Sequence, residues 1–350
     1  MTSPNTDFNS WHVGCDLPTG LFNGNGYLAQ HQRQLQALSV KVDPGYSFAS
    51  NFDGLVRLRN LRHFTWDGAD FVDSYVFAEV LLRNTRHLES VNLGFQYNGQ
   101  ITGALEKALR STCLFVQSDG PPMKRFTALQ NISLRNISLQ TTFSILTPNF
   151  DFSQLRSLKL RDCRYVLNFL RGARLHGTAI NLKALDIDYD APEPGNTEFT
   201  DESQAGGLAP EFVRFLQGFK GLEELCYRAM EYSSASIDQA PAGINYHADT
   251  LKRLVCHYHD KLALGPGKDC PLVFPEGLSS IFQATRLESV GLSILPCDLV
   301  RYILVPVLVE QEADRQRYLL SIILQPHRAS SFCISVSQAN TMLPETSSTS

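Results

Sequence analysis

The segment Cys256–Asp260 reads Cys-His-Tyr-His-Asp and gathers residue types that ligate zinc. Its spacing argues against a metal site. Apolar residues alternate from Leu251 as in a strand with one buried face, so Cys256 and His257 point to opposite sides and cannot share an ion. His257 and His259 share a side, but two ligands do not make a site. We therefore expect no metal here.

A second acidic segment, Asp186–Asp190, matches the first part of a calcium-binding loop. Such a loop requires glycine at its sixth position and glutamate at its twelfth, where this chain has Ala191 and Thr197. A turn around a bound calcium ion is therefore not expected. With neither segment suited to an ion, the sequence predicts no metal and no cofactor.

Sequence motifs of catalysis are missing from the chain. It contains no G-x-S-x-G elbow, no H-E-x-x-H, no phosphate-binding loop and no kinase signature. The glycine cluster Gly20–Gly26 lacks the G-x-G-x-x-G spacing of a dinucleotide site, and we expect a loop there. Cys226 faces outward in its expected strand, with no neighbour that would lower the pKa of its thiol. We expect a protein that is not an enzyme.

The composition is that of a folded chain. It has 350 residues, of which 43% are hydrophobic and 19% charged, with a formal net charge of -4. That charge provides no overall positive field, so we expect neither nucleic acid nor a membrane surface as a partner. The longest apolar run, Tyr302–Val309, is too short to span a bilayer, and the eight cysteines include no C-x-x-C pair. These features predict a reduced protein of the cytoplasm or nucleus.

One phrase, a Leu followed by apolar residues three and five positions later, occurs nine times. Five of the eight intervals between successive phrases are 26 to 29 residues long. Apolar residues at the fourth and sixth positions have the period of a strand with one buried face. The phrases begin at Leu35, Leu61, Leu88, Leu129, Leu155, Leu182, Leu222, Leu251 and Leu287.

Helical patterns lie between several of these strands. Apolar residues spaced three and four apart mark one face of a helix. The patterns cover Leu105–Leu109, Val166–Ala173, Phe212–Phe219 and Leu278–Phe282. Strands that alternate with helices at a near-constant interval all run in one direction, which predicts an α/β fold with a parallel sheet.

The phrase at Leu155, LRSLKLRDC, has the form L-x-x-L-x-L-x-x-C, and the chain resembles the leucine-rich repeat family there. Its irregular intervals and helices resemble the repeat regions of fungal F-box proteins. The resemblance implies an irregular leucine-rich-repeat solenoid of about nine repeats. Its parallel sheet lies on the concave face and its helices on the convex face. The chain departs from the pattern because Cys163 is the only cysteine at a ninth position and intervals of 36, 40 and 41 residues imply inserted loops.

The phrases divide the chain into four expected parts. Residues 1–34 form an N-terminal loop or cap, and residues 35–295 form the repeats. Residues 296–336 cap the far end, and the polar residues 337–350 form a disordered tail. We also expect a solvated insertion at Ala191–Pro210, which is rich in Pro, Gly and acidic residues.

The third, fifth and seventh positions of each phrase point away from the core, onto the concave face. Charge concentrates there in the middle strands. The candidate partner-binding residues are Arg135, Lys159, Arg161, Asp186, Asp188, Arg228, Arg253 and His257. Arginine is enriched in interface hot spots, and basic residues exceed acidic ones on this surface, so we expect an acidic or phosphorylated protein or peptide as the ligand.

A second interpretation of this surface needs no partner. Lys159 with Asp186, and Arg161 with Asp188, would form ion pairs between neighbouring strands. Such pairs stabilise a sheet by less than about 1 kcal/mol each. In that case the charged rows are a solvated face.

The resemblance to F-box proteins implies a substrate receptor of a Skp, cullin and F-box ubiquitin ligase, with the Skp adaptor and cullin as partners. An F-box is not evident, because the short segment before Leu35 contains Leu17-Pro18 followed by a stretch too rich in glycine for a helix. The alternative is a structural or scaffold repeat protein unrelated to ubiquitination. An unrecognised enzyme is a third possibility that no motif supports.

Overall fold

A computed structural model of the chain describes thirteen stretches of residues. They are 9–13, 19–42, 52–69, 74–95, 126–139, 150–175, 179–190, 208–231, 240–260, 281, 286–292, 318–321 and 333–338. All structural statements below concern these residues. Among them, no helix combines the length and the apolar character needed to cross a membrane.

Twelve strands form one sheet in the order β1-β2-β3-β4-β5-β6-β7-β8-β9-β10-β12-β11. The strands are β1 (Asn9–Val13), β2 (Ala37–Val42), β3 (His63–Ala69), β4 (Ser90–Phe95), β5 (Asn131–Arg135), β6 (Ser157–Arg161), β7 (Ala184–Asp190), β8 (Glu224–Glu231), β9 (Arg253–Asp260), β10 (Ser289–Leu292), β11 (Tyr318–Ser321) and β12 (Cys333–Gln338). From β1 through β10, neighbouring strands pair in parallel. The nine strands expected from the repeated phrase are β2 to β10, and the α/β fold with a parallel sheet is confirmed.

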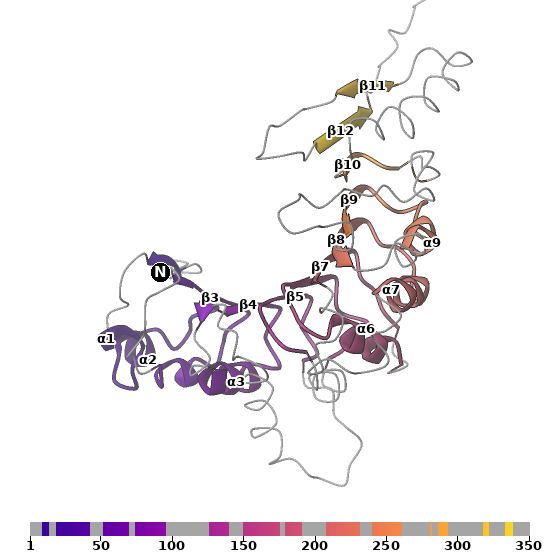
Figure 1. Ribbon diagram of the computed structural model, residues 1–350. Helices are drawn as coiled ribbons and strands as arrows, with labels where there is room; N and C mark the ends of the chain where they lie inside the picture. The colour runs from indigo at the N-terminus through magenta and orange to yellow at the C-terminus, as the bar shows by residue number, and fades with distance from the viewer. Residues whose placement is uncertain are drawn as a thin grey trace, which may run out of the picture.

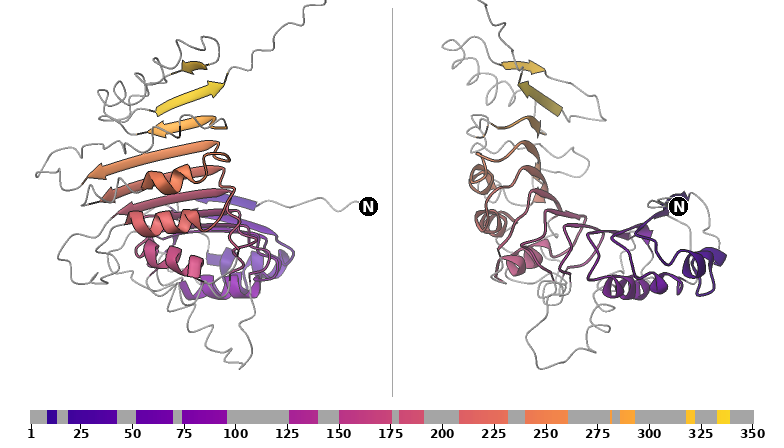
Figure 2. Two further views of the ribbon diagram at one scale, coloured as in Figure 1. Left: turned by 90° about the vertical axis from the view of Figure 1, so that its right-hand side faces the viewer. Right: turned by 180° about the vertical axis from the view of Figure 1, so that it is seen from behind.

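Seven helical segments are described. They are α1 (Thr19–Phe22), α2 (Tyr27–His31), the 3-10 turn η1 (Leu55–Arg57), α3 (Ser74–Arg83), α6 (Val166–Leu175), α7 (Leu208–Gln217) and α9 (Ala240–Asn245). Figure 1 shows a sheet that bends around its middle strands, with strands on the inner side and helices on the outer side. Figure 2 shows from two further directions that α6, α7 and α9 cover the same side of the sheet. The arrangement is open and solenoid-like.

The core lies between the sheet and these helices. In β6 the burial alternates, with Leu158 and Leu160 buried and their neighbours at least partly exposed. The helices contribute the apolar faces expected from their spacing, such as Val166 and Phe169 of α6 and Phe212 of α7. The segment Leu105–Leu109 lies outside the described residues, and Ile281 alone is described in Leu278–Phe282.

A backbone ladder runs along the edge where the strands begin. At each of the eight junctions, the carbonyl of a phrase's second residue accepts hydrogen bonds from the N–H groups of the second and third residues of the next phrase. The second residues, which we name the rim ladder, are Gln36, Arg62, Glu89, Gln130, Arg156, Lys183, Glu223, Lys252 and Glu288. These bonds join repeats whatever the length of chain between them, so long insertions leave the register intact.

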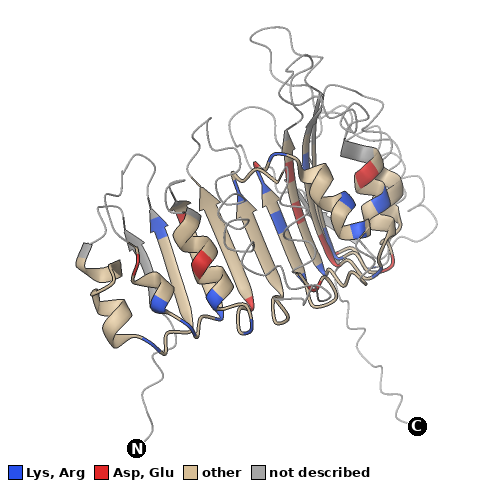
Figure 3. Cartoon of the chain, turned by 90° about the horizontal axis from the view of Figure 1, so that it is seen from below, with Lys and Arg blue, Asp and Glu red and all other residues tan. Residues whose placement is uncertain are grey.

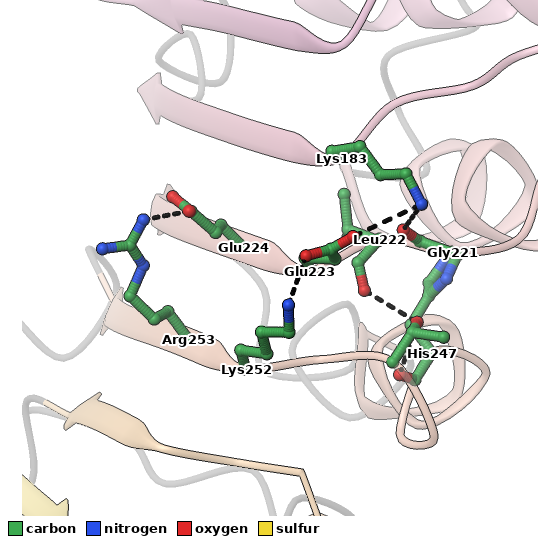
Figure 4. A network of polar contacts seen from close by, with 9 residues as sticks. Lys183, Gly221, Leu222, Glu223, Glu224, His247, Lys252 and Arg253 are labelled. Atoms are coloured by element: carbon green, nitrogen blue, oxygen red, sulfur yellow. Dashed lines mark hydrogen bonds and ion pairs between the residues drawn. The ribbon is translucent and has the colours of Figure 1, made fainter.

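Side chains reinforce the rim ladder at its C-terminal half (Figure 4). Glu223 lies between two lysines, 3.4 Å from Lys183 Nζ and 2.7 Å from Lys252 Nζ. The hydrogen bond from Lys252, followed by that from Lys183, lowers the pKa of the Glu223 carboxyl. Both lysines remain well exposed, so these ion pairs contribute little to the stability of the fold.

A buried asparagine fastens the end of α3 to the segment that precedes β3. The Asn84 amide donates to the carbonyls of Leu58 and Val80, at 2.8 Å each, and its oxygen accepts from the N–H of Leu61 at 2.9 Å. The amide thereby uses both of its donor positions and one of its two acceptor positions. The contact holds two repeats together where no strand hydrogen bonds exist.

The ends of the chain differ in detail from expectation. The helix α1 begins at Thr19 and covers the first residues of the expected loop Gly20–Gly26, and β1 adds a parallel strand outside β2. The expected insertion Ala191–Pro210 is shorter than proposed, because α7 already begins at Leu208. A helix can start there because Pro210 stands in its first turn, where a missing N–H costs nothing.

At the far end, β12 pairs antiparallel with β10 and β11 pairs antiparallel with β12. Of residues 296–336, only Tyr318–Ser321 and residues 333–336 are described, and capping of the sheet by this segment stays a prediction. Residues 337 and 338, which we placed in a disordered tail, complete β12; the rest of that tail lies outside the described residues.

Candidate functional site

The expected partner-binding residues all lie on strands β5 to β9. Arg135 is on β5, Lys159 and Arg161 on β6, Asp186 and Asp188 on β7, Arg228 on β8, and Arg253 and His257 on β9. In these strands the residues at alternate positions are buried against the helices. The eight residues therefore belong to the inner side of the sheet, which we call the concave face.

Strand register brings these residues next to one another. Lys159 lies opposite Asp186, Asp188 lies opposite Arg228, and Arg228 lies opposite His257. Side chains at such parallel positions stand about 4.8 Å apart. Figure 3 shows basic and acidic residues side by side on neighbouring strands. The spatial grouping expected from the repeat is thus present.

The ion pairs differ from those we expected. Arg161, rather than Lys159, binds Asp186, with its Nε 3.0 Å from Oδ2 and a terminal nitrogen on the same oxygen. Arg228 Nη1 lies 3.3 Å from Asp188 Oδ2, so Arg161 and Asp188 are not partners. The guanidinium group offers several N–H donors and reaches a diagonal neighbour, whereas the lysine ammonium is a compact, strongly hydrated charge.

Two further pairs use carboxylates that the sequence did not single out as site residues. Arg253 binds Glu224 on the neighbouring strand β8. Arg135 on β5 binds Asp67 on β3 and therefore crosses β4, where Gly94 occupies the seventh position. A Cβ atom at Gly94 would overlap the Asp67 carboxylate and lie 3.3 Å from Arg135 Nε. A glycine at the seventh position of the middle strand is therefore the sequence feature that permits the ion pair between Arg135 and Asp67.

Asp186 is the most enclosed charge of the face, with 7% of its surface exposed. Its Oδ2 accepts from Arg161, and its Oδ1 is buried without a hydrogen-bond partner among the described residues. Cys226 lies opposite it on β8. Burial, and next the negative charge of Asp186, raises the pKa of the half-buried Cys226 thiol, which favours its protonated form.

The neighbouring carboxylate, Asp188, is half-buried. Burial raises the pKa of its carboxyl, and the Arg228 guanidinium opposes that rise. Asp162 and Asp186 add to the rise through their negative charges. Arg228 thus favours the charged form of the Asp188 carboxyl, and the two residues form one ion pair between β7 and β8.

The arginines remain available to a ligand despite their carboxylate partners. The side chains of Arg135, Arg161, Arg228 and Arg253 are between 39% and 57% exposed. Lys159 is exposed and makes no ion pair within the described part of the chain. Within the described residues, these five cationic groups face four ion-paired carboxylates, with Asp162 a further acidic neighbour of Asp188. Lys159 is the cation of this group that has no carboxylate partner there.

The segment around Cys256 is arranged as the alternation predicted. Cys256 is buried, and burial raises the pKa of its thiol. His257 is partly exposed on the opposite side of β9. The side chains of His259 and Asp260 lie outside the described residues. In the portion that is described, no three His, Cys, Asp or Glu side chains are grouped so as to hold a metal ion.

Comparison with known proteins does not assign the chain to a family, because no protein-family model and no curated protein matches it.

Proposed function

We propose that the protein is a non-catalytic interaction module of the leucine-rich repeat type that binds a protein or peptide on its concave face. The observation that carries this proposal is the row of arginines on β5 to β9, ion-paired yet substantially exposed. The described helices all lie on the other side of the sheet (Figure 2). The row is therefore reachable by a second molecule along several strands.

The carboxylate partners prepare the arginines for binding. A free arginine side chain loses rotamer freedom when it binds, at a cost of about 0.5 to 1.5 kcal/mol. Here the ion pairs hold the guanidinium groups in place before a ligand arrives. Each guanidinium has five N–H donors and uses few of them, so the remaining donors are free for carboxylate or phosphate oxygens.

An acidic or phosphorylated segment is the ligand that fits this surface best. The exposed Lys159 supplies a cation that forms no ion pair within the described chain, and its charge favours an anion. A basic ligand would instead have to displace arginines from Asp186 and Asp188. The ligand we propose thus adds to the existing ion pairs and breaks none.

The repeated phrase extends the proposal to a class of protein. Its likeness to fungal F-box repeat proteins supports a substrate receptor of a Skp, cullin and F-box ubiquitin ligase, acting in the cytoplasm or nucleus. A scaffold protein unrelated to ubiquitination is the second candidate. Both candidates use the same concave face.

The test uses Lys159→Glu as the disrupting variant. Reversing Arg161 instead would leave the buried Asp186 carboxylate without its partner and would damage the fold as well as the site. Lys41→Glu is the matched control. Lys41 is an exposed residue of β2 on the same face, without an ion pair in the described chain, and lies four strands away, roughly 19 Å.

Affinity capture with quantitative mass spectrometry then compares the two variants with the unaltered protein. The proposal expects partners that are lost with Lys159→Glu and retained with Lys41→Glu. Skp adaptor and cullin in every capture would support the ubiquitin-ligase receptor, and stable partners without them would support the scaffold. Identical partners from all three proteins would overturn the concave face as the binding site.

A further inference from the structure

The outer side of the sheet carries a second charged cluster, between α6 and α7. Its centre is Glu211 of α7, whose side chain is only 5% exposed. Three arginines converge on this carboxylate: Arg174 Nε lies 3.0 Å from Oε1, Arg214 Nη1 lies 3.5 Å from Oε2, and Arg171 Nε lies 3.7 Å from Oε2. We call these three residues the outer arginine cluster.

The cluster holds more positive charge than its carboxylate neutralises. Three guanidinium groups face one carboxylate, and within the described residues none of the three makes an ion pair with any other acid. Among the described side chains, two positive charges therefore remain uncompensated at one place. A purely structural clamp between α6 and α7 would need only Arg174, which makes the shortest contact.

The arginines are also open to solvent. Their side chains are between 31% and 63% exposed, and Arg214 is the most exposed of them. Arg171 and Arg174 contact the carboxylate through Nε, which leaves the terminal nitrogens of both guanidinium groups for another acceptor. Buried Glu211 thus holds three guanidinium groups close together at the surface.

We infer that the outer arginine cluster binds the phosphate group of a phosphorylated segment of a partner protein. A phosphoserine or phosphothreonine carries a charge of about -1.5 to -2 at neutral pH, which matches the two uncompensated charges. Arginine forks bind phosphate oxygens in bidentate geometry. Leu175 follows Arg174 at the end of α6 and is 62% exposed, which offers an apolar contact to residues flanking the phosphate.

A membrane surface fits this cluster less well. Adsorption to an anionic bilayer sums about 1 kcal/mol per basic residue over several residues and is favoured by a broad basic surface. Here the excess is two charges at one point on a chain whose formal net charge is -4. A single convergent anion, as in a phosphorylated side chain, suits the geometry better.

The cluster is separate from the concave face. The helices α6 and α7 lie on the side of the sheet opposite to that face (Figure 2). A partner bound on the inner side of β5 to β9 would leave Arg171, Arg174 and Arg214 uncovered. The two surfaces can therefore be tested independently, and the failure of one does not imply failure of the other.

The experiment measures fluorescence anisotropy with a degenerate peptide pool that has phosphoserine at its centre, and with the same pool unphosphorylated. The test variant is Arg171→Gln with Arg214→Gln, which keeps Arg174 on Glu211 and so keeps the buried carboxylate paired. The control is Arg62→Gln with Arg83→Gln. Each of these arginines pairs with one carboxylate, and neither lies on α6 or α7.

We expect the unaltered protein and the control to prefer the phosphorylated pool, and the test variant to bind it about tenfold more weakly or worse. Lys159→Glu should keep the preference, since it changes only the concave face. The inference is overturned if the unaltered protein shows no preference, if the test variant binds as tightly as the control, or if Lys159→Glu abolishes the preference. Binding to vesicles that contain phosphoinositide, without a preference for the phosphorylated pool, also overturns it. Thermal melting of each variant verifies that it is folded.

Discussion

Asp186 shows why single contacts decide which residues of the concave face can be altered. Its carboxylate is nearly buried, and Arg161 neutralises it. A buried charge that loses its partner destabilises a protein far more than the intact pair stabilises it. Arg161 is therefore both a binding candidate and a structural residue, whereas Lys159 can be changed with little effect on the fold.

At the same scale, Leu158 tests the repeat register. This leucine, at the fourth position of its phrase, is fully buried on β6. We expect Leu158→Ala to lower the free energy of unfolding by about 2 to 5 kcal/mol, because it removes apolar contacts and leaves a cavity. In a solenoid-like fold the loss should fall mainly on adjoining repeats. Urea unfolding measures the change.

The matched control for that substitution is Leu175→Ala. Leu175 is the exposed last residue of α6, so its truncation should change stability by no more than about 0.5 kcal/mol. Equal effects of the two substitutions would mean that Leu158 is not in the core and that the phrase has been assigned to the wrong face of the strand.

At the scale of elements, His247 joins α7 to the turn after α9. Its Nε2 donates to the Leu216 carbonyl at 2.9 Å, and its ring packs on Phe219 with centroids 5.0 Å apart. Burial, opposed by the Leu216 hydrogen bond and assisted by the positive charge of Lys220, lowers the pKa of the imidazole below its ordinary value of 6.5. Its Nδ1 is buried without a hydrogen-bond partner in the described chain.

This histidine predicts a loss of stability in acid. Below about pH 6.5 the unfolded chain binds a proton at this histidine more readily than the folded chain, so the free energy of unfolding falls as the pH falls toward the lowered pKa. His247→Gln can still donate to Leu216 and cannot be protonated. Thermal melting between about pH 7.5 and pH 5 should show a smaller decline for the variant. Identical declines would contradict the role of His247.

At the scale of elements, the sequence predicts most strands of the sheet but not the ion pairs between them. Nine strands follow from the spacing of leucines, because the alternation acts locally in every repeat and the backbone rim ladder joins each repeat to the next in the same way. The strand β1 has no such phrase and escapes detection. The ion pairs also escape it: register places Lys159 opposite Asp186, but side-chain length and donor geometry give that carboxylate to Arg161. A pairing across β4, as between Arg135 and Asp67, depends on the bare backbone at Gly94.

At the scale of the whole molecule, curvature separates two surfaces of different character. The inner side presents a long row of paired arginines, and the outer side presents one convergent cluster around Glu211. Under the two proposals, the first surface would bind an extended ligand and the second a single anionic group, so one molecule could hold two partners at once.

The binding of a partner on the concave face can be measured most directly by site-specific photo-crosslinking. A benzoylphenylalanine is placed at Ser133, which lies opposite Lys159 on the inner side of β5, or, in a separate protein, at Arg83 on the outer helix α3. Once a partner has been captured, illumination should give a covalent adduct from position 133 and none from position 83. An adduct from position 83 alone, or equal adducts from both, would contradict binding on the concave face.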